Sequence, residues 1–218
     1  MDPCALRPCP RSRGFTLVEL LIVIGLLGVL AVVMLPSITG ARGEGDRVET
    51  LARMQHLAQA VEAYNRKHGF YPPDNFSLPE ALREELDVKV KGSADETNAG
   101  IESAIVFLHQ RRQGIQGFDD KEDWLANTDG DSGPEIPLLQ RKEKVEVVDA
   151  WGTPLAYFVN TSYGRVQKIR TATGEVIDAA AWKNPKTSGY LAPHKFQIIS
   201  AGPDLRFNTE DDLTIPQR

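Results

Sequence analysis

A continuous apolar run near the N-terminus constrains this chain more than any other feature. It reads FTLVELLIVIGLLGVLAVVML over residues 15–35, and its polar members are Thr16 and Glu19. An α-helix rises about 1.5 Å per residue, so about 20 residues cross the hydrocarbon core of a membrane. We therefore expect a transmembrane helix over residues 15–36. By the positive-inside rule, three preceding arginines predict a cytoplasmic N-terminus: Arg7, Arg11 and Arg13.

Three simpler interpretations of the run compete: a secretory signal peptide, a plain signal anchor and a buried core helix. A signal peptide has a short apolar core and a small-residue cleavage site, whereas residues 36–41 make a poor A-x-A site. The length and purity of the run disfavour a core helix. A plain anchor does not explain Glu19, because a carboxylate deep in a membrane costs about 2.5–3.5 kcal/mol. A free amine at Phe15 would be a partner for Glu19, and it exists only if the bond after Gly14 is cut.

The sequence GFTLVE at residues 14–19 resembles the type IV prepilin signature. The resemblance implies that prepilin peptidase, a membrane enzyme, cleaves after Gly14 and methylates the new N-terminal Phe15. It also implies that Glu19 pairs with the N-terminus of a neighbouring subunit during filament assembly. Pro36 stands where many members of the family carry a helix-kinking proline.

An amphipathic helical pattern follows the apolar run. Apolar residues recur at three- and four-residue spacing over residues 46–67. Gly69 and the two prolines shortly after it predict the end of this helix. The glycine-rich residues 40–45 predict a break or a weak point before it. We therefore expect a broken rod, in which a membrane half is followed by an amphipathic half, residues 37–73, that packs on a globular domain.

Residues 74–144 carry weaker patterns and read as an insertion relative to small pseudopilins. We expect short helices at 79–86 and 101–112 and a loop at 127–137. The loop begins like an EF-hand, with oxygen-bearing side chains at alternate positions: Asn127, Asp129 and Asp131. Its sixth and twelfth positions hold Ser132 and Leu138 instead of the glycine and glutamate of an EF-hand. The loop is therefore not an EF-hand, and another metal role is a minor alternative.

Short apolar segments separated by turn residues predict strands from residue 145 onward. The predicted strands lie at 145–149, 154–159, 168–171, 174–178 and 195–200. We expect a small antiparallel sheet with the long N-terminal helix packed on it, which is an α+β fold of pilin-like type.

Two motifs in this region resemble blocks of the major, G-type pseudopilins of type II secretion. DAWGTPLAY at residues 149–157 resembles their D-x-W-G-x-P-x-x-Y block. Its physical interpretation is structural: Asp149 bonds the turn, Gly152 permits an unusual backbone angle and Trp151 buries a ring. Residues 200–213 resemble the C-terminal S-x-G-x-D…D-D loop, which holds a calcium ion in that family.

The second resemblance implies a Ca²⁺ site in the C-terminal loop. Calcium takes six to eight oxygen ligands, and clustered carboxylates repel one another without a cation. The expected ligands are the side chains of Asp204, Asp211 and Asp212, and the backbone carbonyl of Ala201 is a weaker candidate. The alternative is a solvated acidic loop.

Composition and the remaining motifs exclude several function classes. The formal net charge of −5 disfavours nucleic acid as a partner. Both cysteines, Cys4 and Cys9, precede Gly14, so a chain cut there has no disulfide. The four histidines are scattered, and the sequence has no HExxH, GxSxG, P-loop or Rossmann fingerprint. We therefore expect a structural protein and not an enzyme.

Together these features predict a pseudopilin of a type II secretion-like system. Its expected parts are a leader peptide (1–14), a transmembrane helix (15–36), an amphipathic helix (37–73), an insertion (74–144) and a sheet with the calcium loop (145–218). The resemblance implies a filament of copies of this chain, with other pseudopilins and inner-membrane assembly proteins as partners. It also implies a single-pass protein of the bacterial inner membrane with a periplasmic globular domain. The alternatives are a type IV pilin for adhesion or DNA uptake and a membrane-anchored binding or enzymatic domain.

Overall fold

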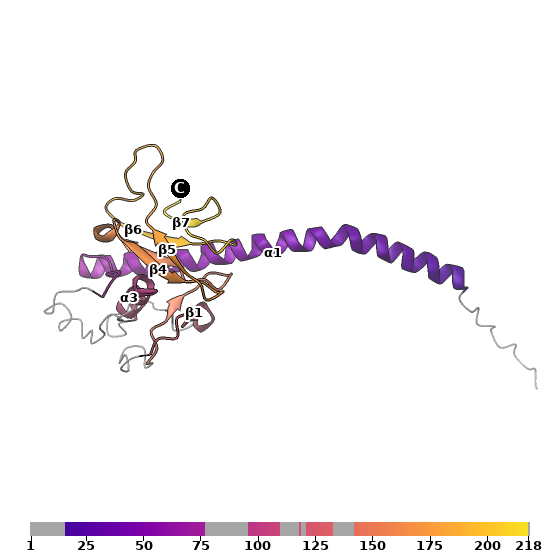
Figure 1. Cartoon of the computed structure of the whole chain (residues 1–218), viewed down its shortest axis with the longest axis horizontal. Helices are drawn as coiled ribbons and strands as arrows, with labels where there is room; N and C mark the ends of the chain where they lie inside the picture. The colour runs from indigo at the N-terminus through magenta and orange to yellow at the C-terminus, as the bar shows by residue number, and fades with distance from the viewer. Residues whose placement is uncertain (1–15, 77–95, 110–117, 119–120, 133–141, 218) are drawn as a thin grey trace, which may run out of the picture. The chain divides into compact units, whose positions relative to one another are not determined.

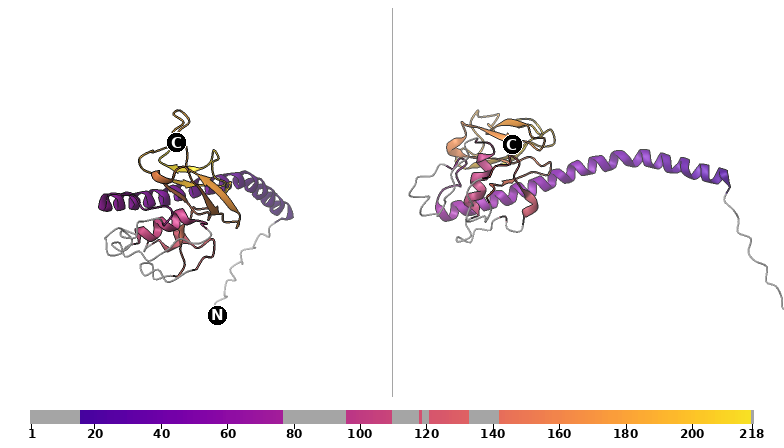
Figure 2. Two further views of the ribbon diagram at one scale, coloured as in Figure 1. Left: turned by 60° about the vertical axis from the view of Figure 1, so that its left-hand side comes forward. Right: turned by 60° about the horizontal axis from the view of Figure 1, so that its bottom comes forward.

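The computed structural model describes residues 16–76, 96–109, 118, 121–132 and 142–217, without the side chains of residues 31–42. The chain divides into two compact units, Met1–Gly43 and Glu44–Arg218. Figures 1 and 2 show that, in the second unit, the strands and α3 gather around the C-terminal part of helix α1.

The longest element is helix α1, Leu17–His68. Contrary to the predicted break at residues 40–45, the helix is continuous through them. Each glycine in a helix interior costs about 1 kcal/mol relative to alanine. Three glycines among good helix formers are therefore not enough to break the helix. The predicted end is confirmed: Gly69 has φ +80° and its N–H donates to the carbonyl of Asn65 at 2.8 Å.

The amphipathic prediction for the second half of α1 is confirmed. A stripe of its side chains is fully buried in the main core of the second unit: Met54, Leu57, Val61 and Tyr64. Burial of such side chains contributes about 1.5–3 kcal/mol each, so this stripe anchors the helix in the domain.

Helix α3, Ala99–Leu108, contributes another part of the same core. It confirms the helix predicted at 101–112, although it starts two residues earlier and ends at Leu108. The helix predicted at 79–86 lies outside the described residues. The described residues also form two short 3₁₀ helices, Glu122–Trp124 and Asn160–Ser162.

The strands of the described residues form three small antiparallel sheets instead of the one expected. Their bounds are β1 Leu125–Ala126, β2 Glu146–Val147, β3 Ala156–Val159, β4 Val166–Arg170, β5 Val176–Ala180, β6 Phe196–Ser200 and β7 Leu213–Ile215. The sheet orders are β1-β2, β3-β6-β7 and β4-β5. Each of the five predicted strands overlaps an observed one. The sequence patterns missed β1 and β7, which are two and three residues long and too short for a period-two pattern. The fold class is α+β, as predicted.

Candidate functional site

The predicted processing residues Gly14 and Phe15 lie outside the described residues. The predicted assembly residue Glu19 lies in the first turn of α1, where it forms a capping box with Thr16. The Thr16 backbone N–H and hydroxyl each donate to Glu19 Oε2 at 2.8 Å. In return, the Glu19 N–H donates to Thr16 Oγ1 at 3.2 Å. The T-x-x-E spacing carries the signal for this cap, and the sequence analysis did not use it.

The first half of α1 exposes a long apolar surface. Its large apolar side chains between Leu17 and Leu30 are 44–78% exposed. Exposed apolar patches of this extent mark sites that another molecule or a membrane covers. Within the part of the chain whose side chains are described, no helix combines the length and hydropathy of a membrane span.

The predicted turn at Asp149 has the bonds expected of it. Asp149 Oδ1 accepts hydrogen bonds from the N–H groups of Trp151 and Thr153, at 3.0 and 2.9 Å. Gly152 has φ +82°, the left-handed region for which its glycine was singled out. Burial raises the pKa of Asp149 to about 6, while the hydrogen bonds from Ser200 and the turn oppose that rise. These contacts support a structural interpretation of the block.

Helix α1 holds this turn from one side. The buried guanidinium of Arg53 donates to the carbonyls of Val148 and Asp149, at 2.8 and 3.2 Å. The hydroxyl of Thr50 accepts a bond from the N–H of Ala150 at 3.0 Å. The turn is therefore fixed to the part of α1 that lies in the second unit.

The C-terminal loop connects β6 to β7 and brings two of its predicted ligands together. The N–H of Asp204 donates to Asp211 Oδ2 at 3.3 Å, and the N–H of Arg206 donates to Asp204 Oδ1 at 2.8 Å. Burial acts to raise the pKa of Asp211, but the hydrogen bonds from Thr209 and the backbone outweigh it and lower the pKa. Asp204 is exposed and Asp211 is half-buried, so their oxygens are accessible from solvent.

The third predicted ligand, Asp212, is buried and braces the loop. Its Oδ2 accepts bonds from Trp182 Nε1 at 3.0 Å and from the N–H of Asn208 at 2.8 Å. Burial raises the pKa of Asp212. Ala201, whose backbone carbonyl is the weaker predicted ligand, is also fully buried. The loop thus has an accessible carboxylate pair, Asp204 and Asp211, and a buried carboxylate behind it.

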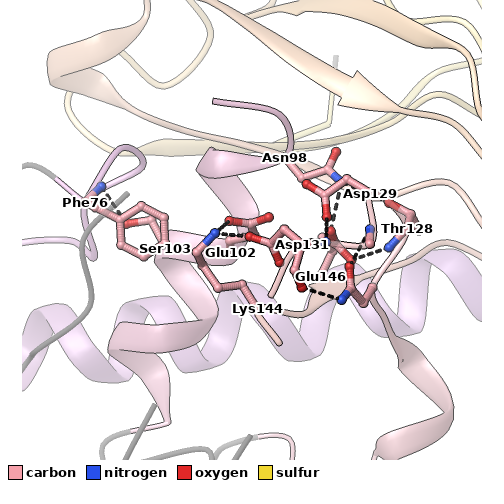
Figure 3. Close-up of polar contacts among 11 residues, drawn as sticks. Phe76, Asn98, Glu102, Ser103, Thr128, Asp129, Asp131, Lys144 and Glu146 are labelled. Atoms are coloured by element: carbon pink, nitrogen blue, oxygen red, sulfur yellow. Dashed lines mark hydrogen bonds and ion pairs between the residues drawn. The ribbon is translucent and has the colours of Figure 1, made fainter. Parts of the chain in front are cut away.

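Another group of carboxylates, the Glu102–Asp129–Glu146 cluster, lies beside α3 (Figure 3). Each residue offers a carboxylate oxygen, and these oxygens lie within 4.8 Å of one another. Elsewhere in the described residues, no other group of three histidine, cysteine or acidic side chains meets this criterion. Burial raises the pKa of Glu102 to about 9 and that of Glu146 to about 8.

The sequence analysis singled out Asp129 and Asp131 but missed the two glutamates. Glu102 lies among the apolar residues of α3, and Glu146 stands between Val145 and Val147. An acidic residue on an apolar helix face or inside an apolar strand is the signal that could have found them.

Comparisons with known proteins give the following similarities. Residues 9–35 match the family model of the prokaryotic N-terminal methylation motif. The chain is 32% identical over 73 residues to type II secretion system core protein G of Escherichia coli (strain K12), covering 34% of this chain and 50% of that protein. It is 28% identical over 132 residues to core protein G of Klebsiella michiganensis, covering 56% and 92%.

A type IV pilin is similar to the same extent. The chain is 31% identical over 106 residues to the type IV major pilin protein PilE of Neisseria gonorrhoeae, covering 49% of this chain and 63% of that protein. The chain thus spans about half the length of the first core protein G named above. No solved structure matches it.

Proposed function

We propose that the chain belongs to the pilin-like family of type IV pilins and type II secretion pseudopilins, and that it is a pseudopilin, a structural subunit of a type II secretion-like filament and not an enzyme. The observation that carries the proposal is the exposed apolar half of α1, which begins within GFTLVE at Leu17. Packing of this surface against lipid before assembly, and against neighbouring helices afterwards, would remove it from water. The similarity to two core G proteins supports a role in a type II secretion-like system.

Cleavage and methylation by prepilin peptidase would be the first step in the maturation of the subunit. Prepilin peptidase would cut after Gly14 and methylate Phe15, leaving an amine one residue before Thr16. Glu19 would then have two competing partners, the Thr16 cap of its own helix and the N-terminus of a neighbouring subunit. The exchange of one partner for the other would pair the carboxylate in a low-dielectric filament core, where an unpaired charge costs several kcal/mol, roughly 2.5–3.5 on insertion scales.

The proposed location follows from the same segment. The subunit would cross the bacterial inner membrane once, with its N-terminus in the cytoplasm and the unit from Glu44 in the periplasm. Its partners would be copies of itself, other pseudopilins and the inner-membrane assembly proteins. The net charge of −5 argues against nucleic acid.

The C-terminal loop would hold Ca²⁺ through Asp204, Asp211 and Asp212. The donor set is all oxygen, as calcium prefers, and the Asp204–Asp211 pair is accessible while Asp212 is fixed from behind. The buried carbonyl of Ala201 is the weaker candidate. A bound ion would neutralise the pair and stiffen the loop at a subunit contact.

A type IV pilin is the second candidate function. It is favoured by the similarity to the gonococcal pilin, which extends over 106 residues at 31% identity. Such a pilin would display the second unit on a surface filament. The two candidates share processing and assembly and differ in whether a filament emerges from the cell.

The test is the intact mass and N-terminal sequence of the full chain expressed with and without a prepilin peptidase. Cleavage to N-methylated Phe15 only in the presence of the peptidase is the expected result. A chain that keeps Met1, or is cut near Ala41, would overturn the proposal. Secretion by a host whose own G-type subunit is deleted then separates the two candidates: a pseudopilin restores secretion, whereas a surface pilin does not.

A further inference from the structure

The Glu102–Asp129–Glu146 cluster draws its residues from α3, the 127–132 loop and β2, and shares none with the C-terminal loop (Figure 3). Its three carboxylates come from three elements that are distant in the sequence. Side-chain and backbone donors hold one of them in place: Asn98 Nδ2 donates to Glu146 Oε1 at 2.8 Å, and the Thr128 N–H donates to Glu146 Oε2 at 3.1 Å.

Two of the three carboxylates are removed from water. Glu102 and Glu146 are 0% exposed, so solvent does not screen their charge. Lys144 bonds Glu102 Oε2 at 3.1 Å and also bonds Asp131, so these two carboxylates share one ammonium. A bound cation would add positive charge beside the buried carboxylates.

One buried oxygen of the cluster is available to a cation. Among the described residues, no hydrogen-bond donor contacts Glu102 Oε1, although the side chain is fully buried. Its other oxygen, Oε2, is taken by Lys144. A buried carboxylate oxygen without a donor costs at least about 1–3 kcal/mol, and a cation contact removes that cost.

The carboxylate oxygens of the cluster favour one kind of ion. Hard cations prefer oxygen donors, whereas thiolate and imidazole ligands suit softer metals. Ligand oxygens on opposite sides of Ca²⁺ lie about 4.6–5.2 Å apart, twice its bond length, whereas those of Mg²⁺ lie about 4.2 Å apart. The oxygens of the cluster lie within 4.8 Å of one another, so one ion could contact all three. Mg²⁺ usually binds through one or two carboxylates and keeps several waters, so a set of three protein carboxylates favours Ca²⁺.

We propose that the Glu102–Asp129–Glu146 cluster binds one Ca²⁺ that is separate from any ion of the C-terminal loop. The ion contacts one carboxylate from each of the three residues, and water supplies the remaining ligands. It ties the 127–132 loop to α3 and β2, and Lys144 keeps its contacts with Glu102 and Asp131.

The test counts calcium ions bound to the full chain in detergent after removal of metal by a chelator, using equilibrium dialysis against ⁴⁵Ca²⁺. Asp129→Asn removes one ligand charge, and the matched control Asp123→Asn removes an exposed carboxylate of the nearby 3₁₀ helix. We expect Asp129→Asn to bind one ion fewer per chain than Asp123→Asn. Both variants keep the C-terminal loop, so its calcium cancels and the outcome does not depend on the proposed function.

A second variant guards against a folding defect. Glu102→Gln preserves the size of the side chain and is expected to lose the same ion while its circular dichroism matches that of the wild type. Calcium should also raise the unfolding temperature of Asp123→Asn by several degrees more than that of either cluster variant. Equal ion counts and equal temperature increments in all three variants would overturn the proposal, and would mean that protons and Lys144 alone neutralise the cluster.

Discussion

Replacing Gly202 by alanine measures how closely the C-terminal loop packs on Asp211. Gly202 has φ +69°, which L-residues other than glycine rarely adopt. A Cβ atom at this position would come within 2.9 Å of the Asp211 carbonyl oxygen and 3.0 Å of Asp211 Oδ2. The nearer contact is a backbone atom, which cannot rotate away. The substitution therefore forces the loop to open around one of the proposed calcium ligands.

The size of the effect follows from two contributions. A left-handed backbone costs an L-residue about 1–2 kcal/mol. Overpacking a close contact adds about 1–3 kcal/mol. Gly174 provides the matched control, because it has φ +86° but no neighbouring atom within 4 Å of the Cβ position. Gly174→Ala should lose the first contribution alone, and Gly202→Ala should lose about 1–3 kcal/mol more.

The assay is urea unfolding of the full chain in detergent with a chelator present, followed by circular dichroism. The free energies of unfolding of Gly202→Ala and Gly174→Ala are compared with that of the wild type. Equal losses in the two variants would refute the close packing of Gly202 on Asp211. No loss in either variant would refute the argument from backbone conformation.

Three further predictions concern α1 and the turn that it holds. Glu19→Gln should reduce the amount of filament recovered by shearing by about tenfold or more, because it removes a charge pair worth at least about 1.4 kcal/mol. Immunoblots should show normal leader cleavage in this variant, and the control Glu44→Gln should give a normal amount of filament. Arg53→Met should lower the free energy of urea unfolding by about 1–3 kcal/mol, since the Val148 carbonyl loses its donor, and Arg53→Lys should recover part of it. The folded-state pKa of Asp149 is raised to about 6 from an ordinary 3.8, so the folded chain binds this proton more tightly than the unfolded chain does. Protonation of Asp149 therefore stabilises the fold fully below about pH 4, and this contribution is lost as the pH rises through 6. Unfolding of the wild type and of Asp149→Asn from pH 4 to 7 should therefore show the wild type losing stability relative to the variant, and a constant difference would contradict the raised pKa.

The sequence predicted those parts of the fold that depend on local patterns. The apolar stripe of Met54, Leu57 and Val61 has the spacing of one helix face, and the structure buries it. The same holds for strands such as β6, whose residues are all buried. The predicted break at residues 40–45 was wrong because glycine lowers helix propensity by an amount that flanking residues can offset.

The sites depended more on tertiary contacts and were predicted only in part. Asp204 and Asp211 are seven residues apart, so a loop motif could pair them. One hydrogen-bond partner of Asp212 is Trp182, which lies 30 residues away on a different segment. No local sequence pattern predicts this contact. Glu102 and Glu146 meet only because α3 packs on β2, a contact that no periodicity specifies.

The hydroxyl of Ser200 joins the two motifs that the sequence treated separately. It donates to Asp149 Oδ2 at 2.8 Å and accepts the N–H of Gly202 at 3.1 Å. The DAWGTP turn and the C-terminal loop therefore share one atom. A chimaera that receives the loop of another subunit must receive the matching turn with it, because a donor loop without this serine leaves a buried carboxylate oxygen without its partner. The two motifs are best exchanged between proteins as a single cassette.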